Sequence, residues 1–108
     1  MTFEDLTKTL LTWPLVEATT THGTPSFKVK GKLLTRLRED GDSLLIKGVE
    51  PDERDMLCET FPDLYYFTDH YRDYPMVLIR LSRADAATVA AMLDRTYRAL
   101  LPKRRVKA

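Results

Sequence analysis

The sequence predicts a single α+β domain, in which one antiparallel sheet carries helices on one face. The length of 108 residues is that of one ordinary domain. The composition, 44% hydrophobic and 31% charged, is typical of a globular protein and not of a disordered one. Segments with helical spacing of apolar residues flank and interrupt short segments with the alternation of strands. We therefore assign residues 1–102 to the domain and residues 103–108 to a basic C-terminal tail.

The N-terminal segment predicts a helix followed by a strand. Thr2 and Asp5 have the spacing of a capping box, and apolar residues at helical spacing follow them, so we expect a helix over 3–12. The segment 16–22 is rich in β-branched residues and predicts a strand. Glycine and proline within 23–25 end that strand in a turn.

A meander of strands is expected next. Residues 26–30 and 32–38 alternate between apolar and polar side chains, and Gly31 lies between them at the tip of a hairpin. The Asp-Gly pair within 39–42 favours a second tight turn, because glycine accepts the positive φ that such turns need. Residues 43–47 are then the returning strand.

The second half of the chain predicts a helix and two further strands. Pro51 at a first helical position, followed by acids, indicates a helix over 51–60. The short aromatic segment 64–67 and the apolar run 76–81 are expected to be strands. The intervening loop, 69–75, is rich in polar and aromatic groups.

A third helix closes the domain. Asp85 is a typical N-cap, and an apolar stripe at helical spacing follows it until Pro102. We expect the core to include Phe27, Val29, Leu33, Leu37, Val77, Ile79, Leu93 and Tyr97.

Cations are concentrated on the predicted outer face of the meander. The net charge is only +1, yet residues 28–38 contain no acid. Because the apolar alternate positions must face the core, the basic ones should face outward or toward a partner. These residues are Lys28, Lys30, Lys32, Arg36 and Arg38, with Arg80 as a further candidate.

Signatures of catalysis are absent from the sequence. No nucleophile elbow, zinc-protease motif or phosphate-binding loop is present, so we expect no enzyme and no cofactor. A metal site would require His22 and His70 to converge with a carboxylate, and ordinary loop histidines are the simpler interpretation. The single cysteine, Cys58, indicates a reducing, cytoplasmic location, and no segment is apolar enough to span a membrane.

Two segments resemble the MmcQ/YjbR family of small bacterial proteins. They are the G-T-P-x-F-K-V hairpin entry of 23–37 and the H-Y-x-x-Y-P motif of 69–81, with the E-D-G-D turn between them. Met76 departs from the pattern, since the family commonly has tryptophan there. The resemblance implies a curved antiparallel sheet in a double-wing arrangement, similar in shape to secretion chaperones and frataxin. It also implies DNA binding, and adds His70 and Arg72 to the basic candidates.

Two functions are compatible with these observations. The first is a non-enzymatic module that binds DNA weakly, and mostly without sequence preference, through the basic sheet face. The alternative is a protein-binding adaptor that presents a hydrophobic groove or the aromatic loop around Tyr71 and Tyr74. A continuous positive surface would favour the first, and a contiguous apolar patch the second.

Overall fold

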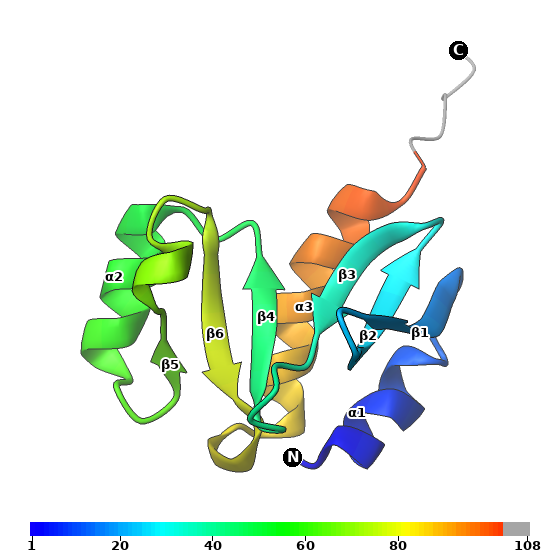
Figure 1. Ribbon diagram of the computed structural model, residues 1–108, viewed down its shortest axis with the longest axis horizontal. Coiled ribbons are helices and arrows are strands. Elements are labelled where there is room, and N and C mark those ends of the chain that lie inside the picture. Colours follow the sequence, from blue (N-terminus) through cyan, green and yellow to red (C-terminus); the bar gives the residue numbers. More distant parts are fainter. Residues whose placement is uncertain (103–108) are drawn as a thin grey trace.

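The computed structural model describes residues 1–102 and has an α+β fold with three α-helices and six strands in that range (Figure 1). The predicted basic tail, 103–108, lies outside the described residues. The elements in order are α1 (Phe3–Leu10), β1 (Val16–Thr21), β2 (Thr24–Val29), β3 (Lys32–Arg36), β4 (Ser43–Lys47), α2 (Pro51–Thr60), β5 (Tyr65–Tyr66), the 3-10 turn η1 (Asp69–Tyr71), β6 (Met76–Arg80), the 3-10 turn η2 (Leu81–Arg83) and α3 (Ala86–Leu100).

The predicted single sheet is not confirmed, because the strands form two antiparallel sheets in the orders β1-β2-β3 and β4-β6-β5. The two sheets meet at a bridge between Leu37 and Leu44, beside the turn of residues 39–42. Beyond Arg36, only Leu37 and Arg38 pair with Leu44 and Ser43 before the turn, so β3 and β4 share the end of a hairpin instead of a full ladder. Each sheet is therefore free to follow its own twist.

Capping explains where the helices begin. Thr2 and Asp5 form the predicted capping box of α1, which ends at Leu10 and is slightly shorter than expected. Asp85 accepts the backbone N–H of Thr88 at the start of α3, as predicted. No helix among residues 1–102 has the length and apolar character needed to cross a bilayer.

All three α-helices contribute to one main hydrophobic cluster, through Leu6 and Leu10 of α1, Leu57 of α2 and Leu93 of α3. Seven of the predicted core residues are confirmed in this cluster, and Leu33 is wrong. The cluster contains the confirmed residues Phe27, Val29, Leu37, Val77, Ile79, Leu93 and Tyr97.

Leu34 occupies the core position that was expected for Leu33. The register of β2 against β3 shifts between Phe27 and Lys28, which leaves one extra residue in β3. A shift of one residue turns side chains to the opposite face of a sheet. Leu34 is consequently 0% exposed in the main cluster, whereas Leu33 packs against a second cluster.

That second cluster lies on the other face of β4-β6-β5 and consists of Leu45, Met76 and Leu78, with Leu33, Tyr66 and Tyr71 packed against it. The expectation of one apolar and one polar sheet face therefore fails here. The segment that contains η1 covers this face, opposite to α3 (Figure 1).

Candidate binding surfaces

Among the predicted basic residues, the lysines of the β2-β3 hairpin are the least engaged in contacts with the described part of the protein. Val29 pairs with Lys32, so Lys30 and Gly31 form a two-residue turn with φ values of 53° and 80°. Positive φ at both positions defines the type I′ turn, whose twist matches that of the strands. Lys30 and Lys32 are exposed and Lys28 is half-buried. Within residues 1–102, none of the three lysines takes part in an ion pair.

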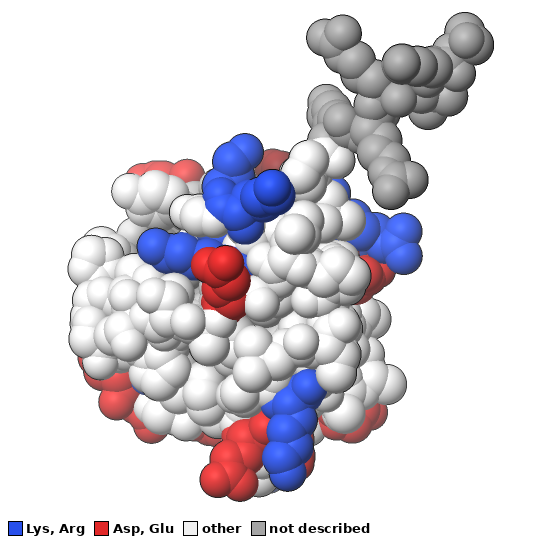
Figure 2. Space-filling model, turned by 90° about the vertical axis from the view of Figure 1, so that its right-hand side faces the viewer, with Lys and Arg blue, Asp and Glu red and all other residues white. Residues whose placement is uncertain are grey.

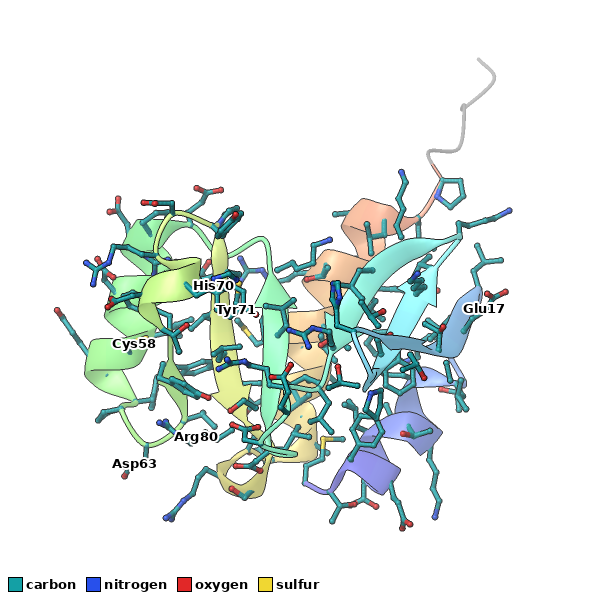
Figure 3. The ribbon with its side chains drawn as sticks, in the orientation of Figure 1. Glu17, Cys58, Asp63, His70, Tyr71 and Arg80 are labelled. Carbon is teal, nitrogen blue, oxygen red and sulfur yellow. The ribbon has the colours of Figure 1, made fainter. Side chains whose placement is uncertain are left out.

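An acid from the neighbouring strand interrupts the basic stripe in space. Glu17 of β1 stands opposite Lys28 in the β1-β2 register. Figure 3 labels Glu17 on its strand. Figure 2 accordingly shows Lys, Arg and acidic atoms close together on this side of the molecule, within a mostly uncharged surface. The sequence run 28–38 contained no acid, but the sheet supplies one.

The predicted arginines are engaged in contacts within the protein. Arg36 donates to the Tyr71 hydroxyl at 3.3 Å and forms an ion pair with Glu39 at 3.3 Å. The guanidinium of Arg38 lies over the Tyr71 ring, 5.6 Å from its centroid. Arg80 lies 4.1 Å from the centroid of Tyr66. These guanidinium groups pack against tyrosines of the second cluster, so they are less available to bind a phosphate.

The two loop residues added by the resemblance have different environments. His70 is exposed, and its ring meets Tyr71 edge-on with centroids 4.8 Å apart. Arg72 is exposed and pairs with Asp69 at 2.6 Å. The structure thus gathers Arg36, Arg38 and His70 around Tyr71, while Arg72 pairs with Asp69 and Arg80 lies beside Tyr66.

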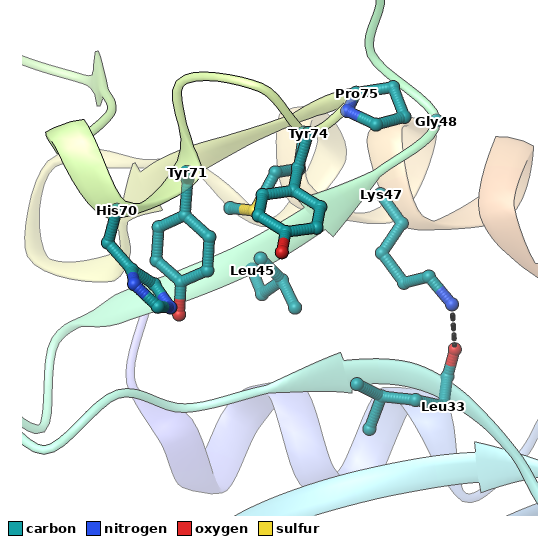
Figure 4. A pocket seen from close by; sticks show the side chains of 9 residues that line it. Leu33, Leu45, Lys47, Gly48, His70, Tyr71, Tyr74 and Pro75 are labelled. Atoms are coloured by element: carbon teal, nitrogen blue, oxygen red, sulfur yellow. Dashed lines mark hydrogen bonds between the residues drawn. The ribbon is translucent and has the colours of Figure 1, made fainter.

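A pocket of about 280 Å³ opens beside this loop (Figure 4). Its wall is mainly apolar, and the ionisable groups of the described chain that border it are Lys47, His70 and two tyrosines, with no carboxylate from residues 1–102. Lys47 reaches from β4 toward β3 and donates to the backbone oxygen of Leu33 at 3.1 Å. The lining residues are Leu33, Leu45, Lys47, Gly48, His70, Tyr71, Tyr74, Pro75 and Met76.

Arg54 of α2 holds the loop that forms the pocket, a role that the sequence did not reveal. This arginine is only 4% exposed. Its Nη1 donates to the backbone oxygens of Tyr71, Arg72 and Tyr74 at 3.4, 3.1 and 3.2 Å. Its guanidinium lies 4.0 Å from the centroid of the Phe67 ring. The available signal was its position three residues before Leu57, on the buried face of the helix.

The turn that joins the two sheets is stabilised by Asp40. Its Oδ1 accepts the backbone N–H groups of Asp42 and Ser43, at 2.9 and 2.8 Å. Partial burial raises the pKa of Asp40. The hydrogen bonds from Ser43 and Asp42 and the charge of Arg38 outweigh burial and lower this pKa to about 2.

The structure also gives the environments of the cysteine and of the residues that could bind a metal ion. Burial raises the pKa of the Cys58 thiol, which disfavours the reactive thiolate. Among residues 1–102, no three histidine, cysteine, aspartate or glutamate side chains are grouped to hold a metal ion.

Comparison with known proteins identifies the family of the chain. No curated protein and no solved structure matches the sequence. The family model described as YjbR matches residues 11–99, which run from the end of α1 to the last turn of α3 and include both sheets, the hairpin and the pocket. The chain therefore belongs to the YjbR family.

Proposed function

We propose that this protein is a small non-enzymatic binding module that holds duplex DNA weakly, through the phosphate backbone, at the β2-β3 hairpin. The observation that carries the proposal is the set of lysines Lys28, Lys30 and Lys32, which are at least partly exposed and make no ion pair within residues 1–102. Lysine ammonium groups bind phosphate as point charges and read no base edges. Sequence preference should accordingly be slight.

The contacts described above set the expected strength. Glu17 faces Lys28, Arg36 is paired with Glu39, and Arg72 is paired with Asp69. About two or three phosphate contacts remain, so log K should fall against log salt with a slope of about −2 to −3. Affinity at physiological salt should be near the weak end of non-specific binding, about 10⁻⁴ M.

The test is fluorescence anisotropy of a short labelled duplex at several salt concentrations. The hairpin variant Lys30→Asn/Lys32→Gln should flatten the slope by about two units. Its matched control is Lys8→Gln/Arg83→Gln, which removes the same charge from exposed positions on α1 and η2. Wild type that fails to bind at low salt would overturn the proposal. Equal losses in both variants would assign binding to overall charge and not to the hairpin.

The pocket favours a second candidate, the protein-binding adaptor. Tyr74 borders the pocket and is 57% exposed, so an apolar group is available to a partner at the surface. Tyr74→Ala should weaken the binding of a protein partner at the pocket. It should leave the slope of log K against log salt for DNA unchanged, because no hairpin lysine borders the pocket. The same variant therefore separates the two functions.

A further inference from the structure

The pocket beside η1 combines an apolar interior with an ammonium group that has no counter-ion among the described residues, 1–102. Leu33, Leu45 and Met76 line it from the strands. The rings of Tyr71 and Tyr74 border it from the loop (Figure 4). Lys47 lies on the opposite side, half-buried, and makes no ion pair within the described range 1–102.

The ammonium group of Lys47 has hydrogen-bond donors available for a ligand. An ammonium group has three N–H donors. One N–H group donates a hydrogen bond to the backbone oxygen of Leu33, at 3.1 Å. Two donors therefore remain, on a half-buried cation beside an apolar wall. A partly desolvated cation of this kind favours an anionic acceptor, and charged hydrogen bonds are the strong ones.

The size of the pocket restricts the ligand further. A cavity of about 150 Å³ is enough for a benzene ring. The 280 Å³ here leaves room for one ring with a short acidic side chain. It lies just below the usual range of small-molecule sites, about 300–1,000 Å³. A large cofactor does not fit this volume.

We infer that this pocket binds a small monocarboxylate with an aromatic or branched apolar body, the body resting on Leu45 and Met76 and the carboxylate accepting from Lys47. Within residues 1–102, the lining contains the cation Lys47 and no aspartate or glutamate that would repel the carboxylate of this ligand. His70, exposed at the border, can donate a ring N–H to the same carboxylate. This binding is independent of DNA binding, since the hairpin lysines do not border the pocket.

The test uses phenylacetate as the probe, with phenylacetamide as its neutral counterpart, and follows the backbone amide resonances of the full chain. Phenylacetate should give saturable shifts at Gly48, His70 and Tyr71, with a dissociation constant of about 1 mM or lower. Phenylacetamide should bind about tenfold more weakly, because it lacks the charge that Lys47 recognises. Equal binding of the two probes, or no saturation by phenylacetate, would overturn the inference.

Three variants locate the site. Lys47→Gln removes the charge and keeps a donor, and should reduce phenylacetate affinity about tenfold while leaving phenylacetamide unchanged. Leu33→Phe should fill the pocket and reduce binding of both probes. Lys8→Gln is the control, since it removes the charge of a lysine on α1 that does not border the pocket. An equal loss in Lys8→Gln and Lys47→Gln would contradict the assignment.

A peptide arm distinguishes the source of the carboxylate. A peptide that ends in phenylalanine presents the same ring and acid as a free small molecule. If this peptide binds more tightly than phenylacetate and shifts residues beyond the pocket, the small-molecule site is wrong and the pocket belongs to an adaptor. Peptide binding no tighter than phenylacetate, and confined to the pocket, supports the small-molecule site.

Discussion

The two sheets of this protein differ in how far their strands are exposed to solvent. Along β1 the four central residues are exposed, whereas in β4 and in β6 four of the five residues are buried. The first sheet has a solvent face, and the second is covered on both faces. Continuous apolar runs such as 76–79 are typical of strands buried on both sides. A strand of this kind therefore requires a cover on its second face, which another segment must provide.

The cover over the second sheet is a short loop and not a helix. Tyr71 of the loop packs against the second cluster, and Arg54 anchors the loop backbone from α2. A loop this short does not fill the whole face, and the pocket remains where the cover ends. The candidate sites therefore arise differently: the hairpin from an open sheet, and the pocket from an incompletely covered one.

The largest expected effect tests whether the second cluster is a true core. Leu78 in this cluster and Leu93 in the main cluster are both 0% exposed. Leu78→Ala and Leu93→Ala should each lower the free energy of unfolding by about 2–5 kcal/mol. Chemical denaturation measures both. A loss below about 1 kcal/mol for Leu78→Ala alone would mean that the loop does not pack as a core layer.

The next effect concerns the anchor of the cover. Arg54→Met keeps the apolar stem and removes the donor that three backbone oxygens share, so the free energy of unfolding should fall by about 2–3 kcal/mol. Hydrogen exchange should accelerate most in residues 68–75. Exchange that rises equally in β1 and β2 would show a general loss of stability and not a released loop. Arg95→Met, at an exposed arginine paired with Glu53, is the control.

The sequence was sufficient for most elements because their signals are local. The capping box of Thr2 and Asp5, Pro51 at a helix start and the Asp40-Gly41 turn each act over a few residues. The division into two sheets was missed because β4 forms its ladder with β6, a strand distant in sequence, and not with its neighbour β3. The position of Leu34 was missed because a bulge shifts the alternation by one residue.

The candidate sites were harder to predict, for a related reason. The lysines of the hairpin could be identified because they are close in sequence, and their exposure follows from the strand pattern. Glu17 beside Lys28, and Arg36 beside Tyr71, are contacts between distant segments. The pocket requires three such segments, represented by Leu33, Lys47 and Tyr74, to converge. No spacing in the sequence encodes that convergence.

A smaller effect tests the junction between the sheets. The pKa of Asp40 is lowered from 3.8 to about 2, so its contribution to stability is present above pH 4 and is lost as the pH falls toward 2. Because the side chain is largely exposed, we expect about 1 kcal/mol. Asp40→Asn should lose this amount at neutral pH, and its stability should converge with that of wild type near pH 2. Unfolding curves that stay apart at pH 2 would assign the loss to something other than the charge.

The smallest expected effect is a gain, and it concerns the open sheet. Lys30 adopts φ of 53° at the first turn position, a conformation that asparagine accepts more readily than lysine. Lys30→Asn should therefore raise the free energy of unfolding by about 0.5 kcal/mol. Lys32→Asn, in a strand, should give no gain, and a loss with Lys30→Asn would contradict the turn geometry. A stabilised hairpin that binds DNA less well would separate the charge of Lys30 from its structural role, because unfolding could not explain the weaker binding.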